Sequence, residues 1–140
     1  MGRVAEYLVD TSAWARARKP AVREVLDPLI RKGLVGTCAT VDLEMLYSAR
    51  NVAEHDSMRI ERSSFEWLAV FDECWERAID VQRALCAVGR HRGVPMADLL
   101  IAATAERHGV TVLHYDADFD VIAEVTGQLT QWVVPHGTAD

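Results

Sequence analysis

The chain has 140 residues, of which 50% are hydrophobic, and its formal net charge at pH 7 is −6. This length supports one domain with a substantial apolar core and little more, so we expect residues 1–140 to form a single domain. The apolar runs are far shorter than the roughly 20 residues needed to cross a bilayer, which excludes a membrane-spanning protein. The negative charge argues mildly against a protein that coats nucleic acid, but it leaves an acidic metal site open because bound cations offset carboxylates.

Cysteine usage and the first residues point to one compartment. Cys38, Cys74 and Cys86 form neither an even disulfide set nor a Cys-x-x-Cys metal pair, so each is expected to pack as a small apolar residue. The opening MGRVAEYLVD lacks the apolar stretch of a signal peptide. We therefore expect a cytoplasmic protein.

The first half of the chain alternates between strand and helix patterns. The run AEYLVD, residues 5–10, has the composition of a buried strand. Apolar residues at helical spacing follow over residues 22–30, where Pro28 predicts a kink or a break into two short helices. A second strand is expected at 34–39 (LVGTCA), and a helix at 41–50 that Thr40 could cap.

The second half repeats the alternation. A polar, amphipathic helix is expected over 56–67, and a longer helix with an apolar face at 78–88. The segment MADLLIAATAERH, residues 96–108, reads as a buried helix that precedes the strand pattern TVLHYD at 111–116. A short helix at 119–125 and a strand at 130–134 complete the pattern. Strands alternating with helices predict an α/β fold with a mainly parallel central sheet flanked by helices.

Two aspartates follow two of the predicted strands directly. Asp10 ends the first apolar run, and Asp116 ends the run that begins at Thr111. Sites in open parallel sheets form beyond the carboxyl ends of the strands, so a functional pair is one interpretation. The alternative is that turns after strands favour aspartate in any case.

Two further acids lie in the first turns of predicted helices, Glu44 and Asp98. First-turn acids often do no more than complement the helix dipole, and for Glu44 alone that reading is the better one. Asp98 is different because the following LLIAA requires a buried helix, and an isolated buried carboxylate is costly to dehydrate.

Together these acids describe a cage of carboxylate oxygens at one edge of the sheet. Such oxygen ligands suit Mg²⁺ or Mn²⁺, whereas Zn²⁺ prefers histidine and cysteine. Asp118 lies two residues beyond Asp116 and could reach a second ion or cap the next helix; Asp120 is the weaker candidate. Asp42 lies on another face of its helix from Glu44 and is expected to be solvated.

Four segments in register carry a family resemblance: LVDTSAW, ATVDLEMLYSAR, VPMADLLIAATAERHG and VLHYDADFDVIA. With them the chain resembles the PIN-domain proteins, and within these the VapC-type toxins of bacterial toxin–antitoxin pairs. The resemblance implies a PIN fold with an acidic pocket at the strand ends. It matches five residues to the family's metal-site acids: Asp10, Glu44, Asp98, Asp116 and, as a further acid of many members, Asp118.

The resemblance also implies an activity and partners. The family's activity is that of an endoribonuclease dependent on Mg²⁺ or Mn²⁺, in which activated water attacks a phosphodiester of RNA. It further implies a VapB-type antitoxin, whose tail often places an arginine in the acidic pocket, and a homodimer. Thr11 or Ser12 matches the family's hydroxyl position beside the first aspartate, while His114 departs from the threonine or serine common before the acidic turn.

Basic and aromatic residues near the acids leave two interpretations open. Arg16, Arg18 and Lys19, and Arg90, His91 and Arg92, could contact RNA phosphates or could be solvated loop charges. Trp14 could stack on a base, but is better read as part of an apolar surface held by the antitoxin.

Other classes fit less well. A phosphorelay receiver domain needs paired acids after the first strand and a late lysine, but Asp10 is alone there and the lysines, Lys19 and Lys32, are early. A haloacid-dehalogenase-like phosphatase needs Asp-x-Asp where this chain has Asp-Thr-Ser. The open alternative is a catalytically inactive PIN-type module that binds RNA or a protein.

Overall fold

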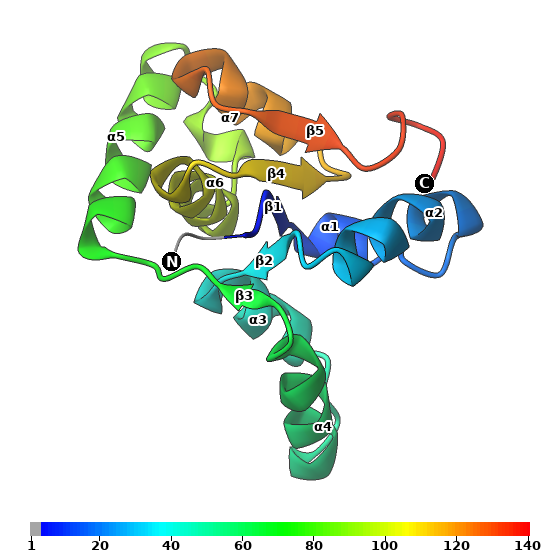
Figure 1. Ribbon diagram of the computed structural model, residues 1–140. Helices are drawn as coiled ribbons and strands as arrows, with labels where there is room; N and C mark the ends of the chain where they lie inside the picture. The colour runs from blue at the N-terminus through cyan, green and yellow to red at the C-terminus, as the bar shows by residue number, and fades with distance from the viewer. Residues whose placement is uncertain (1–3) are drawn as a thin grey trace.

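The computed structural model describes residues 4–140 and contains a central parallel sheet (Figure 1). Its strands are β1 (Tyr7–Val9), β2 (Val35–Thr37), β3 (Glu66–Trp67), β4 (Thr111–His114) and β5 (Thr130–Trp132). They lie in the order β3-β2-β1-β4-β5, and every neighbouring pair is parallel. The α/β fold with a mainly parallel sheet is therefore confirmed.

Helices cover the sheet on both faces (Figure 1). They are α1 (Thr11–Trp14), α2 (Pro20–Arg31), α3 (Ala39–Leu46), α4 (Val52–Arg62), α5 (Asp72–Ala87), α6 (Met96–His108) and α7 (Asp118–Thr126), with a 3-10 turn at His91–Gly93. In Figure 1, α5, α6 and α7 lie on one side, α1 and α2 lie near the C-terminus on the other, and α4 extends from the sheet end that carries β3. None of the helices within residues 4–140 is long and apolar enough to cross a membrane.

Alternation along the central strands explains why both faces are covered. Leu8 of β1 and Val112 of β4 are paired in register and belong to the core cluster shared with α5, α6 and α7. The next pair, Val9 and Leu113, points to the opposite face and packs with residues of α2. Successive side chains of a strand face opposite sides, so continuous apolar runs are what this doubly covered sheet needs.

Two local expectations were wrong. Pro28 does not divide its helix, because α2 runs unbroken from Pro20 to Arg31 and the amide of Lys32 bonds the carbonyl of Pro28. The carbonyl that Pro28 leaves without a partner belongs to Glu24, which is exposed to water. The helix expected over 56–67 is instead α4 at Val52–Arg62, and Trp67 belongs to β3, a strand too short to leave a sequence pattern.

Candidate metal centre

The carboxyl ends of β1 and β4 meet at one edge of the sheet. The two strands are parallel neighbours, with Val9 paired to Leu113. Asp10 follows β1 directly, and Asp116 follows β4 after one intervening residue, Tyr115. The topology thus brings together two acids that lie 106 positions apart in the chain, as the sequence pattern predicted.

Asp10 is held by the residue two positions after it. Its Oδ2 accepts hydrogen bonds from the amide of Ser12 at 2.9 Å and from the hydroxyl of Ser12 at 2.6 Å. Its other oxygen, Oδ1, is buried and has no protein hydrogen-bond partner. Burial raises the pKa of Asp10, and the bonds from Ser12 act against that rise.

Asp98, Asp116 and Asp118 form a compact cluster. Each offers an oxygen, and these three oxygens all lie within 4.8 Å of one another. Asp98 lies in the first turn of α6, whose residues 98–105 are all buried, so the packing of this helix fixes its carboxyl group at the strand ends. Asp118 begins α7, and its amide donates to Oδ1 of Asp116 at 2.9 Å.

The electrostatics of the cluster are unfavourable to ionised carboxylates. Burial, followed by the charges of Asp10 and Asp116 and by a hydrogen bond with Asp118, raises the pKa of Asp98 to about 8. The pKa of Asp118 is also raised, again chiefly by burial. Like charges held close together in a partly dry site retain protons unless a cation joins them.

Glu44 lies at the margin of this group. It is exposed on α3, and its Oε1 accepts a hydrogen bond from the hydroxyl of Thr11 at 3.0 Å. Partial burial and the charge of Asp10 raise its pKa. The two neighbouring hydroxyl groups thus have separate partners, because Ser12 holds Asp10 while Thr11 holds Glu44.

The residues present fit a hard divalent cation. The donors are carboxylate oxygens, which Mg²⁺ and Mn²⁺ favour. Oδ2 of Asp98, like Oδ1 of Asp10, is buried without a protein hydrogen-bond partner. Such oxygens are costly to bury unless something positive satisfies them.

His114 takes the place of the hydroxyl residue expected before the acidic turn. It is fully buried, and its Nδ1 accepts a hydrogen bond from the amide of Asp116 at 3.1 Å. Burial lowers the pKa of His114 to about 4, which keeps the ring neutral and Nδ1 free to accept. The departure at this position therefore retains a hydrogen bond within the turn.

Asp42 is the clearest error of the sequence analysis. It was expected to be solvated, but its Oδ1 accepts hydrogen bonds at 2.7 Å from both Nε of Arg62 and the hydroxyl of Thr37. Arg62 is itself buried, a rare state for arginine unless it is paired. The sequence carried no local signal for this pair because its members lie 20 residues apart.

Trp14 packs against the core through part of its ring. The ring is partly buried, packs against both main core clusters and lies 5.2 Å from the ring of Phe65. The guanidinium of Arg62 lies 5.4 Å from the Trp14 ring centroid. Contact of Trp14 with a base or an antitoxin stays a prediction.

Three of the basic residues near the acids have protein partners. Arg16 donates through Nε to the carbonyl of Ala139, and Lys19 donates to the main-chain oxygen of Asp140. Arg90 forms an exposed ion pair with Glu124 at 3.0 Å. These contacts favour the structural interpretation of Arg16, Lys19 and Arg90 over phosphate binding.

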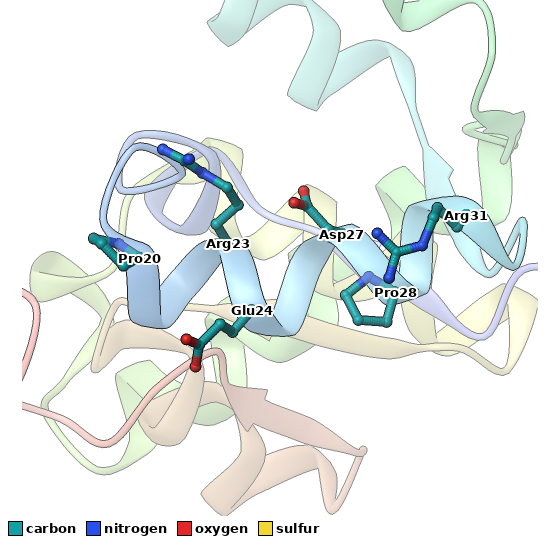
Figure 2. A pocket seen from close by; sticks show the side chains of 6 residues that line it. All are labelled: Pro20, Arg23, Glu24, Asp27, Pro28 and Arg31. Carbon is teal, nitrogen blue, oxygen red and sulfur yellow. The ribbon is translucent and has the colours of Figure 1, made fainter.

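A separate hollow lies along the surface of α2. It measures about 370 Å³ and is lined by Pro20, Arg23, Glu24, Asp27, Pro28 and Arg31 (Figure 2). Two basic and two acidic side chains line it, and Figure 2 shows Glu24 and Asp27 pointing to opposite sides of the helix. None of the five acids predicted for the metal site lines it.

Comparisons with known proteins agree with this geometry. Residues 7–125 match the PIN domain family. Ribonuclease VapC51 of Mycobacterium tuberculosis is 47% identical over 135 residues, which cover 96% of this chain and 98% of that protein. Ribonuclease VapC18 of the same organism is 42% identical over 134 residues, covering 94% and 98%.

Two solved structures share the fold. One is the DNA-bound VapBC from Salmonella typhimurium, with a TM-score of 0.73 and 18% identity over 93% of this chain and 99% of that one. The other is VapBC-5 from Mycobacterium tuberculosis, with a TM-score of 0.66 and 21% identity over 93% and 99%. At such identity these structures support the fold alone. With the family match and the curated relatives, they show that the chain belongs to the PIN-domain family and to its VapC group.

Proposed function

We propose that this protein is the toxin of a VapBC-type toxin–antitoxin pair, a metal-dependent endoribonuclease that hydrolyses phosphodiester bonds of RNA. The observation that carries the proposal is the cluster of Asp98, Asp116 and Asp118, whose oxygens lie within 4.8 Å of one another. It occurs in a chain that closely resembles proteins named ribonucleases over nearly its whole length.

The proposed ligands are Asp10, Asp98, Asp116 and Asp118, with Glu44 binding directly or through water. Mg²⁺ is the proposed ion, and Mn²⁺ is expected to substitute because both favour oxygen donors. Mg²⁺ retains several waters, so not all five acids need to contact it. When bound, the ion supplies a Lewis acid that activates water and offsets the charge of the attacked phosphate.

The residues around the ligands hold them in place. Ser12 orients Asp10 through two hydrogen bonds and leaves Oδ1 of that carboxylate free. Nδ1 of His114 accepts from the amide of Asp116, and the carboxylate of Asp116 accepts from the amide of Asp118. Burial and neighbouring acids raise the pKa of Asp98, so its carboxyl group would hold a proton until a cation offset those charges.

Hydrolysis of this kind has a defined product. The oxygen of water forms a new bond to phosphorus, the bond to the 3′ oxygen breaks, and that oxygen takes up a proton. The fragments therefore carry a 5′-phosphate and a 3′-hydroxyl. The RNA 2′-hydroxyl does not act as the nucleophile, so no cyclic phosphate forms.

The proposed partner is a VapB-type antitoxin. Structures that share this fold include VapBC complexes. An arginine of the antitoxin could pair with the same carboxylates that bind the cation, since guanidinium groups bind carboxylates strongly. Occupation by arginine and occupation by metal would then exclude each other.

Three further properties belong to the proposal. A homodimer is expected, and the exposed apolar side chains Trp75, Ile79 and Met96 on α5 and α6 support an interface between copies. The whole of residues 1–140 is taken as one domain. Because the proposed substrate is cellular RNA, we place the activity in the cytoplasm.

The test is cleavage of total cellular RNA by the purified protein without antitoxin, in Mg²⁺, in Mn²⁺ and in EDTA. We expect discrete fragments with 5′-phosphates that EDTA abolishes. Asp98→Asn should lose cleavage and retain the fold by circular dichroism. Asp80→Asn is the matched control because Asp80 is exposed on α5, and it should cleave like the wild type.

Two outcomes would contradict the proposal. Cleavage by Asp98→Asn equal to that of the wild type would overturn the site. A folded wild-type protein that binds RNA but does not cleave it with either ion would favour the catalytically inactive module instead.

A further inference from the structure

Residues 135–140, here called the tail, are anchored to the body of the protein within the part of the chain that the structure describes. Ala139 is only 2% exposed. At the other end of the tail, the ring of His136 stacks on that of Trp132 with 4.2 Å between centroids. In Figure 1 the C-terminus lies beside α1 and α2, on the side of the sheet opposite α5 and α6.

The hydroxyl of Tyr115 is the centre of this attachment. It donates to Oδ1 of Asp140 at 2.7 Å and accepts from the amides of Gly137 at 2.8 Å and Ala139 at 2.9 Å. One donor and two acceptor lone pairs are all that a phenol offers, so its hydrogen-bonding capacity is filled. Tyr115 is itself buried, at 6% exposure.

Arg16 contacts both Tyr115 and the tail. Its guanidinium lies 4.4 Å from the centroid of the Tyr115 ring. The same group donates to the carbonyls of Ala139 and Ser12, each at 2.9 Å. The tail is therefore joined by Arg16 to the residue that orients Asp10.

A second path leads from the tail to the acids through Tyr115. Its amide donates to the hydroxyl of Ser12 at 2.9 Å, and that hydroxyl donates to Oδ2 of Asp10 at 2.6 Å. Tyr115 also directly precedes Asp116 in the chain, so the position of its ring sets where the acidic turn begins. Both strand-end acids are thus linked to Tyr115, the residue whose side chain contacts the tail.

We infer that Tyr115 is a positioning residue and that the tail, through Tyr115 and Arg16, holds Asp10 and Asp116 in the geometry that binds the cation. The inference rests on the proposed function for the identity of the ligand. Residues that orient metal ligands without contacting the metal typically affect its affinity by about 10–100-fold. A tail that served only general stability would change unfolding and leave metal affinity unaltered.

The test compares Tyr115→Phe and Arg16→Ala with the wild type, using the full chain without antitoxin. Mn²⁺ binding is measured by calorimetry, and the folded fraction is checked by circular dichroism in EDTA. We expect about tenfold weaker Mn²⁺ binding in each variant under conditions where both are folded. Tyr7→Phe is the matched control, since it removes a hydroxyl for which no hydrogen bond is described, and it should bind like the wild type.

Amide hydrogen exchange in EDTA tests the positioning role of Tyr115 without relying on metal binding. In EDTA, the main-chain amide of residue 115 should exchange faster in Tyr115→Phe than in Tyr7→Phe. If the wild type binds Mn²⁺ and both variants bind it equally well, the positioning role is wrong and the proposed function stands. If the wild type binds no Mn²⁺, the proposed metal site fails, and the exchange rates alone support or overturn the positioning role.

Discussion

Asp98 combines burial with crowding by other acids, and this combination has a chemical consequence. Asp98 is 7% exposed, and its Oδ2 has no hydrogen-bond partner within residues 4–140. Without a cation the protonated form of Asp98 is favoured, because a buried charge beside like charges is disfavoured. In the proposed site, a metal ion would therefore displace a proton from Asp98.

Proton release on metal binding should show this exchange. At pH 7, Asp98 is mostly protonated because its pKa is raised to about 8, so Mn²⁺ binding should release close to one proton per ion. At pH 9 the release should fall, since the group is already ionised. Calorimetry in buffers of different ionisation enthalpy measures the number, and buffer-independent heats at pH 7 would contradict it.

His114 should make the protein sensitive to acid. Its folded-state pKa is lowered to about 4 from the ordinary 6.5, so the stability from burying a neutral ring is present above pH 6.5. That stability is lost as the pH falls toward 4, by up to about 3 kcal/mol. His114→Asn retains an acceptor for the amide of Asp116 and should flatten this dependence.

The measurement for His114 is urea unfolding at pH 7 and pH 4.5. The difference between the two pH values should be smaller in His114→Asn than in the wild type. His55→Asn on α4 is a matched control and should follow the wild type. An equal pH dependence in His114→Asn and wild type would place the acid sensitivity elsewhere.

At the scale of elements, one buried arginine ties α4 to its neighbours. Arg62, the last residue of α4, contacts Asp42 of α3 and the hydroxyl of Thr37 in β2. Its guanidinium also lies 5.5 Å from the ring centroid of Phe65. Because α4 extends from the sheet, this contact sets how its C-terminal end is attached (Figure 1).

Removing Arg62 should lower the free energy of unfolding far more than removing an exposed arginine. Arg62→Ala leaves the carboxylate of Asp42, which is only 16% exposed, without its cation, and we expect a loss of about 3 kcal/mol in the free energy of unfolding. Arg90→Ala breaks the exposed pair with Glu124 and should cost under about 1 kcal/mol. Chemical denaturation of both variants decides the point, and equal losses would contradict it.

The elements that could be predicted from the sequence are those whose burial requires a continuous or periodic pattern of apolar residues. The runs that end at Asp10 and Asp116 became β1 and β4 because both sheet faces are covered, which demands continuous apolar residues. The two-residue β3 and the single turn of α1 are too short for any period to appear. Pro28 does not break α2 although an interior proline removes one helical hydrogen bond, and the carbonyl it leaves without that bond belongs to Glu24, an exposed residue.

At the scale of the molecule, the sequence predicted which acids converge but not what holds them. Asp98, Asp116 and Asp118 do lie together, and Asp10 faces them closely enough to raise the pKa of Asp98. Their roles as ligands stay predictions. Among the supports, the family resemblance pointed to the hydroxyl of Thr11 or Ser12 beside Asp10. Contacts such as Ser12 with Tyr115 could not be predicted, because they join residues 103 positions apart and leave no periodic signal.

A fold that gathers carboxylates for a cation is less stable without it. For Asp98 the folded pKa lies above the ordinary 3.8, so stability is full below pH 3.8 and falls as the pH rises toward 8. Asn has nearly the same shape and no charge. In EDTA at pH 8, Asp98→Asn should therefore be more stable than the wild type, on the order of 2 kcal/mol, and at pH 4 the two should converge.

Saturating Mn²⁺ should invert this order. The ion binds the folded wild type, in which the carboxylates are gathered, and stabilises it by mass action, whereas the variant lacks a ligand and gains less. Thermal unfolding of both proteins at pH 8, with EDTA and then with Mn²⁺, measures the inversion. A variant less stable than the wild type in EDTA would mean that Asp98 contributes to the fold through its charge. The cluster would then be a structural feature rather than a site maintained at the expense of stability.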